Sequence, residues 1–312
     1  MDFYQEISTR SKKGTQVWNN KSFIDSWSLK EPFFVDPQGK LSNSTAFTAA
    51  HHGRSVFLGE FQYGDSTCHV FAKGCGWSNG LVQGWCPELG NLGLFNKAAA
   101  MHEVEVSIAL NDINIRTITP MEVWEYDSIP DAMGGKDRSP DSISDLYGNP
   151  SCPSLFVYAS SSKYRLCELP LLHEKERLSV IGELLSKFRE STIEDYLLRF
   201  AGVLGEFTGK LHSVGGHNYA ASTHNVFLDG TLIDFEYVYL PKFPTQDPNI
   251  NQRPDSWMDK ELLGWWDTIS SLKTYLPCAV GNGELISTFF NNYRDHGGRT
   301  NLDMYRYFSQ SM

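Results

Sequence analysis

The sequence predicts an α+β fold in which a sheet-rich part comes first and a helical part follows. Residues 55–73 and 113–126 carry short apolar, partly β-branched runs bounded by turn residues, a composition typical of strands. From residue 178 onward, apolar residues recur at the spacing of about 3.6 that indicates helices. Strands grouped before helices favour the α+β class.

The strand-rich part contains a predicted hairpin and a predicted helix. Residues 55–62 and 67–73 flank Tyr63-Gly64-Asp65-Ser66, a sequence typical of a hairpin turn. Residues 97–112 place apolar side chains along one helical face. Residues 1–50 are mixed in character, with spaced aromatic residues, and are expected to form an N-terminal extension that packs on the sheet-rich lobe.

The C-terminal part is predicted to be mainly helical. Gly215-Gly216 ends the second of its helices. The helical periodicity covers residues 178–188, 193–211, 258–276 and 283–293. A last short strand is predicted at residues 155–158, so the chain divides into a sheet-rich N-lobe (51–160) and a helical C-lobe (161–312).

A hairpin within the C-lobe carries the first candidate site. Val226-Phe227-Leu228 and Thr231-Leu232-Ile233 are separated by Asp229-Gly230, a strong signal for a two-residue turn because both turn positions need positive φ. Counting outward from this turn places Asn225 opposite Asp234, with Cβ atoms about 4.5–5.5 Å apart. An amide oxygen and a carboxylate suit Mg²⁺. The alternative is an ordinary surface hairpin with a polar closing pair.

Lys73 and Glu103 are the second candidate pair. Lys73 ends a predicted strand and precedes Gly74-Cys75-Gly76, where the backbone can approach a ligand closely. A lysine in this position is expected to contact phosphate; the alternative is a solvated lysine at a strand end. Glu103 lies near the apolar face of the helix, and because an unpaired buried carboxylate is very costly, Lys73 is its predicted partner.

The composition excludes several classes of function. The net charge is −10 and no run of Lys or Arg occurs, which argues against a nucleic-acid or anionic-membrane partner. No apolar stretch has the length of a membrane span and no signal peptide is evident, so a cytoplasmic location is expected, with delivery into another cell as an open alternative. The six cysteines are scattered and are expected to be reduced packing thiols; Cys75, beside a lysine, is the candidate for a reactive one.

Four short blocks, in this order and spacing, resemble the selenoprotein O family of kinase-like protein adenylyltransferases, as a divergent and shortened relative. Residues 70–76 are similar to the family's strand that ends in K-G-x-G, and Glu103 is similar to the glutamate of its ion-pair helix. Ser162-Lys163-Tyr164-Arg165 resembles a block whose arginine helps to hold the nucleotide. Thr223-His224-Asn225, with Asp234 nine residues later, resembles the family's metal-binding T-D-N…D.

The resemblance implies a bilobal protein kinase-like fold that binds ATP with Mg²⁺ or Mn²⁺. Asn225 and Asp234 would bind the metal, and His224 would replace the family's acidic residue as general base, since a neutral histidine can accept a proton near pH 7. The nucleotide would be bound by Lys73, Gly74, Gly76, Lys163 and Arg165, with Lys73 and Glu103 also given catalytic roles.

Three functions follow from these residues. The preferred one is transfer of AMP from ATP to a hydroxyl of a protein or peptide. A kinase that phosphorylates a small molecule or a biosynthetic peptide would use the same residues, and the acidic chain would suit a cationic acceptor. The third is a nucleotide-binding pseudokinase, favoured by His224 and by Ala220 in the region where kinases carry a catalytic aspartate.

Overall fold

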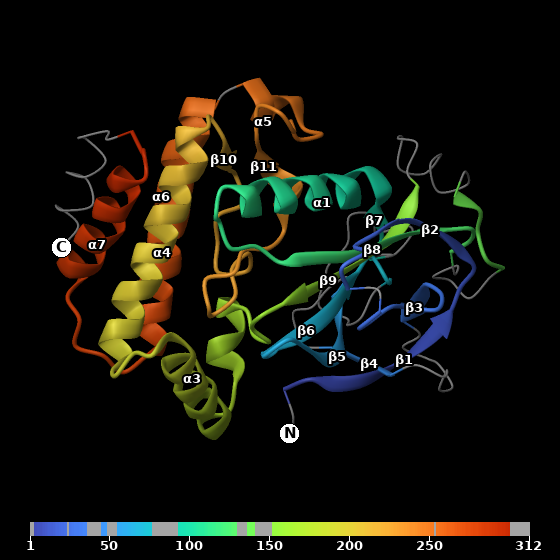
Figure 1. Ribbon diagram of the computed structural model, residues 1–312, viewed down its shortest axis with the longest axis horizontal. Helices are drawn as coiled ribbons and strands as arrows, with labels where there is room; N and C mark the ends of the chain where they lie inside the picture. Colours follow the sequence, from blue (N-terminus) through green and yellow to red (C-terminus); the bar gives the residue numbers. More distant parts are fainter. Residues whose placement is uncertain are drawn as a thin grey trace. The chain divides into compact units, whose positions relative to one another are not determined.

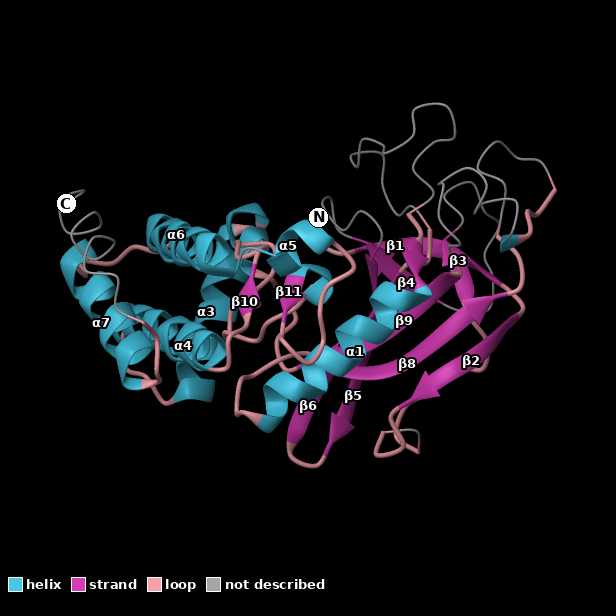
Figure 2. Ribbon diagram, turned by 90° about the horizontal axis from the view of Figure 1, so that it is seen from above, coloured by secondary structure: helices cyan, strands magenta, loops and turns pink. Residues whose placement is uncertain are grey.

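The chain is a mixed α and β protein with a large antiparallel sheet and a set of helices (Figures 1 and 2). The computed structural model describes residues 3–23, 25–35, 45–48, 55–76, 93–129, 136–140, 152–252 and 254–299. It forms two compact units. The first consists of Met1–Val104 and Ile118–Ser161, and the second of Glu105–Thr117 and Ser162–Met312.

The first unit is built on the antiparallel sheet. Among the described residues its strands are β1 (Gln5–Ser11), β2 (Gly14–Asn19), β3 (Phe33–Val35), β4 (Thr45–Thr48), β5 (Ser55–Tyr63), β6 (Ser66–Lys73), β7 (Phe95–Asn96), β8 (Thr119–Tyr126) and β9 (Pro153–Ser160). Their order in the sheet is β2-β8-β9-β6-β5-β4-β1-β3, and β7 pairs with β9.

The predicted β5–β6 hairpin is confirmed. Tyr63 pairs with Ser66 at the turn, and Ser55 pairs with Lys73 at the other end. The strand predicted within residues 113–126 is shorter, since β8 begins only at Thr119. Asn114, with φ of 58°, lies in the turn that separates this strand from the preceding helix.

The N-terminal residues, which were expected to cover the sheet-rich lobe, supply strands to the sheet itself. β2 pairs with β8, with Gly14 opposite Tyr126, and β1 pairs with both β3 and β4. Most side chains of β1 and β2 are exposed or half-buried, so these strands lack the apolar alternation that predicts a strand. Residues 1–2, 24, 36–44 and 49–50 of the predicted extension lie outside the described residues.

A buried carboxylate fixes the segment between β2 and β3 to the sheet. Glu122 of β8 is 2% exposed. It accepts hydrogen bonds from Ser28 Oγ (2.6 Å), Leu29 N (3.2 Å) and Trp124 Nε1 (2.8 Å). These donors satisfy a charge that would otherwise be costly to bury.

Helix α1 (Lys97–Asp112) has the predicted bounds. Asn96 caps its first turn, because Asn96 Oδ1 accepts a hydrogen bond from Ala98 N at 2.7 Å. Its residues up to Val104 belong to the first unit, and those from Glu105 belong to the second.

The second unit is mainly helical. Its helices are α3 (Glu174–Phe188), α4 (Ile193–Ser213), α5 (Pro248–Gln252), α6 (Pro254–Tyr275) and α7 (Asn282–Asp295), with the 3₁₀ turns η1 (Leu166–Leu171) and η2 (Phe235–Tyr237) and the short strands β10 (His217–Asn218) and β11 (Val238–Tyr239). In the described part of the chain, no helix combines the length and apolar character needed to cross a bilayer.

Glycines bring α4 and α7 into close contact (Figure 1). A Cβ atom on Gly205 would lie 2.1 Å from the carbonyl oxygen of Phe289, and one on Gly209 would lie 2.3 Å from that of Tyr293. Any larger residue at these positions would push the two helices apart.

Candidate functional site

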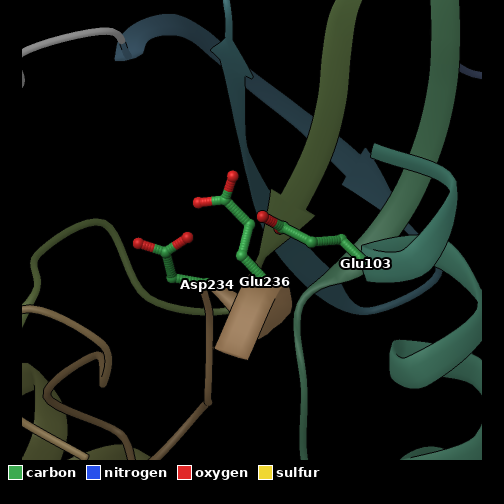
Figure 3. Close-up of side chains that lie close together, drawn as sticks. All are labelled: Glu103, Asp234 and Glu236. Carbon is green, nitrogen blue, oxygen red and sulfur yellow. The ribbon is translucent and has the colours of Figure 1, made fainter. Parts of the chain in front are cut away.

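Lys73 and Glu103 form the predicted ion pair. Lys73 Nζ lies 2.5 Å from Glu103 Oε1, and both side chains are buried. Lys73 ends β6, and Glu103 projects from α1 (Figure 3). The lysine ammonium also lies 4.3 Å from the centre of the Phe95 ring. The ion pair therefore links the central strand of the first unit to its helix.

The glycines after Lys73 are required by packing within the protein. Gly74 and Gly76 have φ of 89° and 87°, a region that other residues rarely adopt. A Cβ on Gly74 would lie 2.4 Å from the carbonyl oxygen of Ser154, and one on Gly76 would lie 2.7 Å from the Phe34 ring. These contacts explain both glycines without a ligand.

Cys75, between these glycines, is a packing thiol. Its side chain is buried, and burial raises the pKa of the thiol to about 12. At neutral pH the sulfur therefore carries its proton and is a poor nucleophile. Burial therefore favours the packing role over a reactive Cys75, and the ammonium of the neighbouring Lys73 is paired with Glu103.

The turn at Asp229-Gly230 exists, but the predicted register is wrong by one residue. Val226 pairs with Leu232, and Phe227 N donates to Thr231 O at 2.8 Å, so the turn contains three residues, 228–230. Only Gly230 has positive φ (80°), whereas a two-residue turn would require it at Asp229 as well. Asn225 therefore faces Ile233, whose N donates to Asn225 O at 3.1 Å, and does not face Asp234.

Several side chains hold this turn in place. Asp229 is 2% exposed; its Oδ1 accepts from Thr231 N at 3.0 Å, and its Oδ2 lies 2.8 Å from Lys187 Nζ of α3. Tyr196 of α4 donates its hydroxyl to Leu228 O at 2.6 Å. The position of the segment that leads to Asp234 is thus determined by two helices.

The second unit carries an acidic pair that can hold a metal ion. The carboxylate oxygens of Asp234 and Glu236 approach within 4.8 Å of one another (Figure 3). Phe235 between them is fully buried, while both acids are half-buried. Asp234 itself has φ of 69°, which is uncommon for a residue other than glycine.

Glu236 was not predicted as a ligand, although the sequence contains a signal for it. In Asp234-Phe235-Glu236 an apolar residue stands between two acids, so burial of the ring leaves both carboxylates toward the surface. Asn225 adds an amide nearby in sequence; its Nδ2 donates to Ala220 O at 2.7 Å, which leaves Oδ1 as the atom able to bind a metal. Oxygen donors of this kind fit Mg²⁺ or Mn²⁺.

The predicted nucleotide block and the predicted metal block lie side by side in the second unit. Leu166 N donates to Val226 O at 2.9 Å, and Leu228 N donates to Tyr164 O at 3.0 Å. Arg165 Nη1 donates to His224 O at 3.1 Å, while the His224 side chain is exposed. The Lys163 ammonium lies 5.6 Å from the centre of the Tyr164 ring.

The predicted site residues thus form two groups, one in each unit. The first unit holds Lys73, Gly74, Gly76 and Glu103. The second unit holds Lys163, Arg165, His224, Asn225 and Asp234, together with the additional Glu236.

Comparison with known proteins gives no match among family models or curated sequences and a distant likeness among solved structures. Among solved structures the chain is similar to WaaP in complex with acyl carrier protein, with 12% identity over 85% of this chain and 86% of that chain and a TM-score of 0.40. A likeness at this TM-score carries no argument about function.

Proposed function

We propose that the chain is an ATP- and Mg²⁺-dependent transferase of the kinase-like superfamily, which transfers AMP to a hydroxyl of a protein or peptide. The observation that carries this proposal is the buried Lys73–Glu103 ion pair, 2.5 Å long, between a strand and a helix. Protein kinases require a strand lysine paired with a helix glutamate in order to bind nucleotide phosphates.

The first unit supplies the cation for the phosphates. Lys73 would pair with phosphate oxygens, and Glu103 would hold its ammonium in place, because a long lysine side chain is otherwise free to adopt many rotamers. The backbone of Gly74 and Gly76 would also contact the nucleotide.

The second unit supplies the metal ligands and the base. Asn225, Asp234 and Glu236 would hold Mg²⁺, which when bound would neutralise charge on the phosphates. Arg165 and Lys163 would add positive charge. His224 would accept the proton of the acceptor hydroxyl as its oxygen attacks the α-phosphorus, and pyrophosphate would leave with the electrons of the broken P–O bond.

A kinase is the second candidate. In protein kinases a lysine–glutamate pair of the same kind as Lys73–Glu103 serves γ-phosphoryl transfer. The same residues would then act while the acceptor oxygen attacks the γ-phosphorus and ADP leaves. The acceptor would be a small molecule or a biosynthetic peptide, and the net charge of −10 favours a cationic one.

The test is incubation with Mg²⁺ or Mn²⁺ and ATP labelled at the α position, and in parallel at the γ position. Auto-modification and transfer to basic peptides are both followed. Label retained only from α-labelled ATP supports AMP transfer, and label only from γ-labelled ATP establishes a kinase. ATP binding without any transfer would make the chain a pseudokinase.

Two variants and a control test the residues. Asp234→Ala and Lys73→Met are expected to abolish transfer at a temperature where both remain folded. Lys97→Met is the control, because Lys97 forms an ion pair of similar length with Glu125 (2.7 Å) on the partly exposed surface of the same unit. Undiminished transfer in both Asp234→Ala and Lys73→Met would rule out the proposed site.

A further inference from the structure

Glu261 of α6 is a buried carboxylate that the proposed reaction does not use. It is 1% exposed, and no lysine or arginine forms an ion pair with it within the described ranges. Its Oε2 accepts a hydrogen bond from Asn218 N at 2.6 Å and lies 3.1 Å from His212 Nε2. Its Oε1 accepts from Trp265 Nε1 at 3.1 Å. Because a buried carboxylate is costly unless it is hydrogen-bonded, these three partners hold Glu261 in one position.

From Asn218 the hydrogen bonds continue to the proposed metal ligand. Asn218 Oδ1 accepts from Ala220 N at 2.9 Å. Ala220 O in turn accepts from Asn225 Nδ2 at 2.7 Å. This last bond engages the nitrogen of the Asn225 amide within the protein and leaves its oxygen, Oδ1, for a ligand. Glu261 is thus connected to Asn225 by three consecutive hydrogen bonds, all within the second unit.

In the other direction the network reaches α7. His212 Nδ1 lies 2.9 Å from the hydroxyl of Tyr293, and that hydroxyl donates to Arg299 O at 3.1 Å. His212 and Tyr293 are both buried, so neither can exchange these partners for water without opening the packing between α4 and α7.

We propose that Glu261 is a positioning residue for the metal-binding amide of Asn225, and that Tyr293 supports it through His212. This proposal rests on the proposed function, in which Asn225 binds the metal. Partners that orient a metal ligand typically change metal affinity by about 10–100-fold when they are removed. Glu261 would act on the metal only through residues 218–225, because its own carboxylate oxygens already bind Asn218, His212 and Trp265.

The test measures the binding of Mn²⁺ by electron paramagnetic resonance, with the full chain and a non-hydrolysable ATP analogue. Glu261→Gln has one acceptor oxygen in place of two and cannot accept from Asn218, His212 and Trp265 together, so Mn²⁺ affinity is expected to fall by about 10–100-fold. Tyr293→Phe removes only the hydroxyl next to His212 and is expected to cause a smaller fall in the same direction.

Trp265→Phe is the matched control. It removes a donor to the other oxygen of Glu261 and disturbs the same core, but it leaves the contacts with Asn218 and His212 intact. Its Mn²⁺ affinity is expected to match that of the unchanged protein. Equal weakening in Trp265→Phe and Glu261→Gln would mean that Glu261 is only part of the core and would overturn the proposal.

Asp234→Ala separates this proposal from the proposed function. If Asp234→Ala binds Mn²⁺ as well as the unchanged protein does, the proposed metal site is wrong. If Asp234→Ala loses Mn²⁺ while Glu261→Gln keeps full affinity, the metal site stands and the positioning role is overturned. Should Glu261→Gln not fold, Tyr293→Phe decides in its place, and an unchanged affinity there would overturn the proposal.

Discussion

Lys73 Nζ and Glu103 Oε1 lie 2.5 Å apart, and the two side chains are 4% and 0% exposed. Removing one partner of such a pair leaves the other charge buried and uncompensated, which costs about 3–5 kcal/mol. Lys73→Met and Glu103→Gln are each expected to lower the free energy of unfolding by this amount. The double variant should lose much less than the sum, because it leaves no buried charge.

Urea denaturation of the unchanged protein, both single variants and the double variant gives this comparison directly. If the double variant lost as much unfolding free energy as the two single variants together, the two groups would not interact. Such a result would also remove the observation on which the proposed function depends.

The three-residue turn depends on Gly230. Its φ is 80°, and a Cβ there would lie 3.0 Å from Val203 Cγ1. Gly230→Ala is therefore expected to destabilise the protein by about 1–2 kcal/mol, the cost of a left-handed backbone for a residue with a side chain. Gly182→Ala is the control, because Gly182 lies inside α3 with open space around it. It should be neutral or stabilise by up to about 1 kcal/mol; equal destabilisation by both variants would argue against the turn geometry.

His217 gives the stability of the protein a pH dependence. Burial lowers its pKa below the usual 6.5, although the charge of Glu261 acts in the opposite direction. The unfolded chain then takes up a proton before the folded chain does, so stability is full above about pH 6.5 and falls as the pH drops toward the folded-state pKa. Thermal unfolding between about pH 8 and pH 5 should show a steeper loss of Tm for the unchanged protein than for His217→Leu. Parallel curves would assign the loss to other groups.

Cys75 should resist alkylation in the folded protein. Burial raises its pKa to about 12, and its side chain is not accessible to a reagent. Cys278 is partly exposed and serves as the internal reference. With iodoacetamide at about pH 8, peptide mapping is expected to find Cys278 modified in the folded protein and Cys75 modified only after unfolding. Rapid modification of Cys75 in the folded state would contradict its assignment as a packing thiol.

The sequence predicts the helices well because their signals are local. Helix α1 has the expected bounds, Lys97–Asp112, since apolar spacing and the Asn96 cap act within a few residues. The pairing of Lys73 with Glu103 could also be predicted, because the cost of an unpaired buried carboxylate requires a cation and the chain offers one at the end of β6.

The turn register and the N-terminal strands could not be predicted in the same way. Asp-Gly favours both a two-residue turn and a three-residue turn that ends in a left-handed glycine. The choice here is made by contacts distant in sequence, in particular Lys187 with Asp229 and Tyr196 with Leu228. β2 likewise owes its place to pairing with β8 and not to its own composition.

The division of the chain between the two units has a consequence for any attempt to separate them. The polypeptide passes from one unit to the other after Val104, after Thr117 and after Ser161. Cleavage at a single peptide bond therefore cannot separate the two units cleanly, because one fragment always carries segments of both. Proteolytic nicking within residues 118–161 should give two fragments that co-elute until denaturant is added, because each fragment still contributes segments to a common fold. The same connectivity makes that region suited to split-protein complementation, in which two inactive halves are expressed separately and regain structure on mixing.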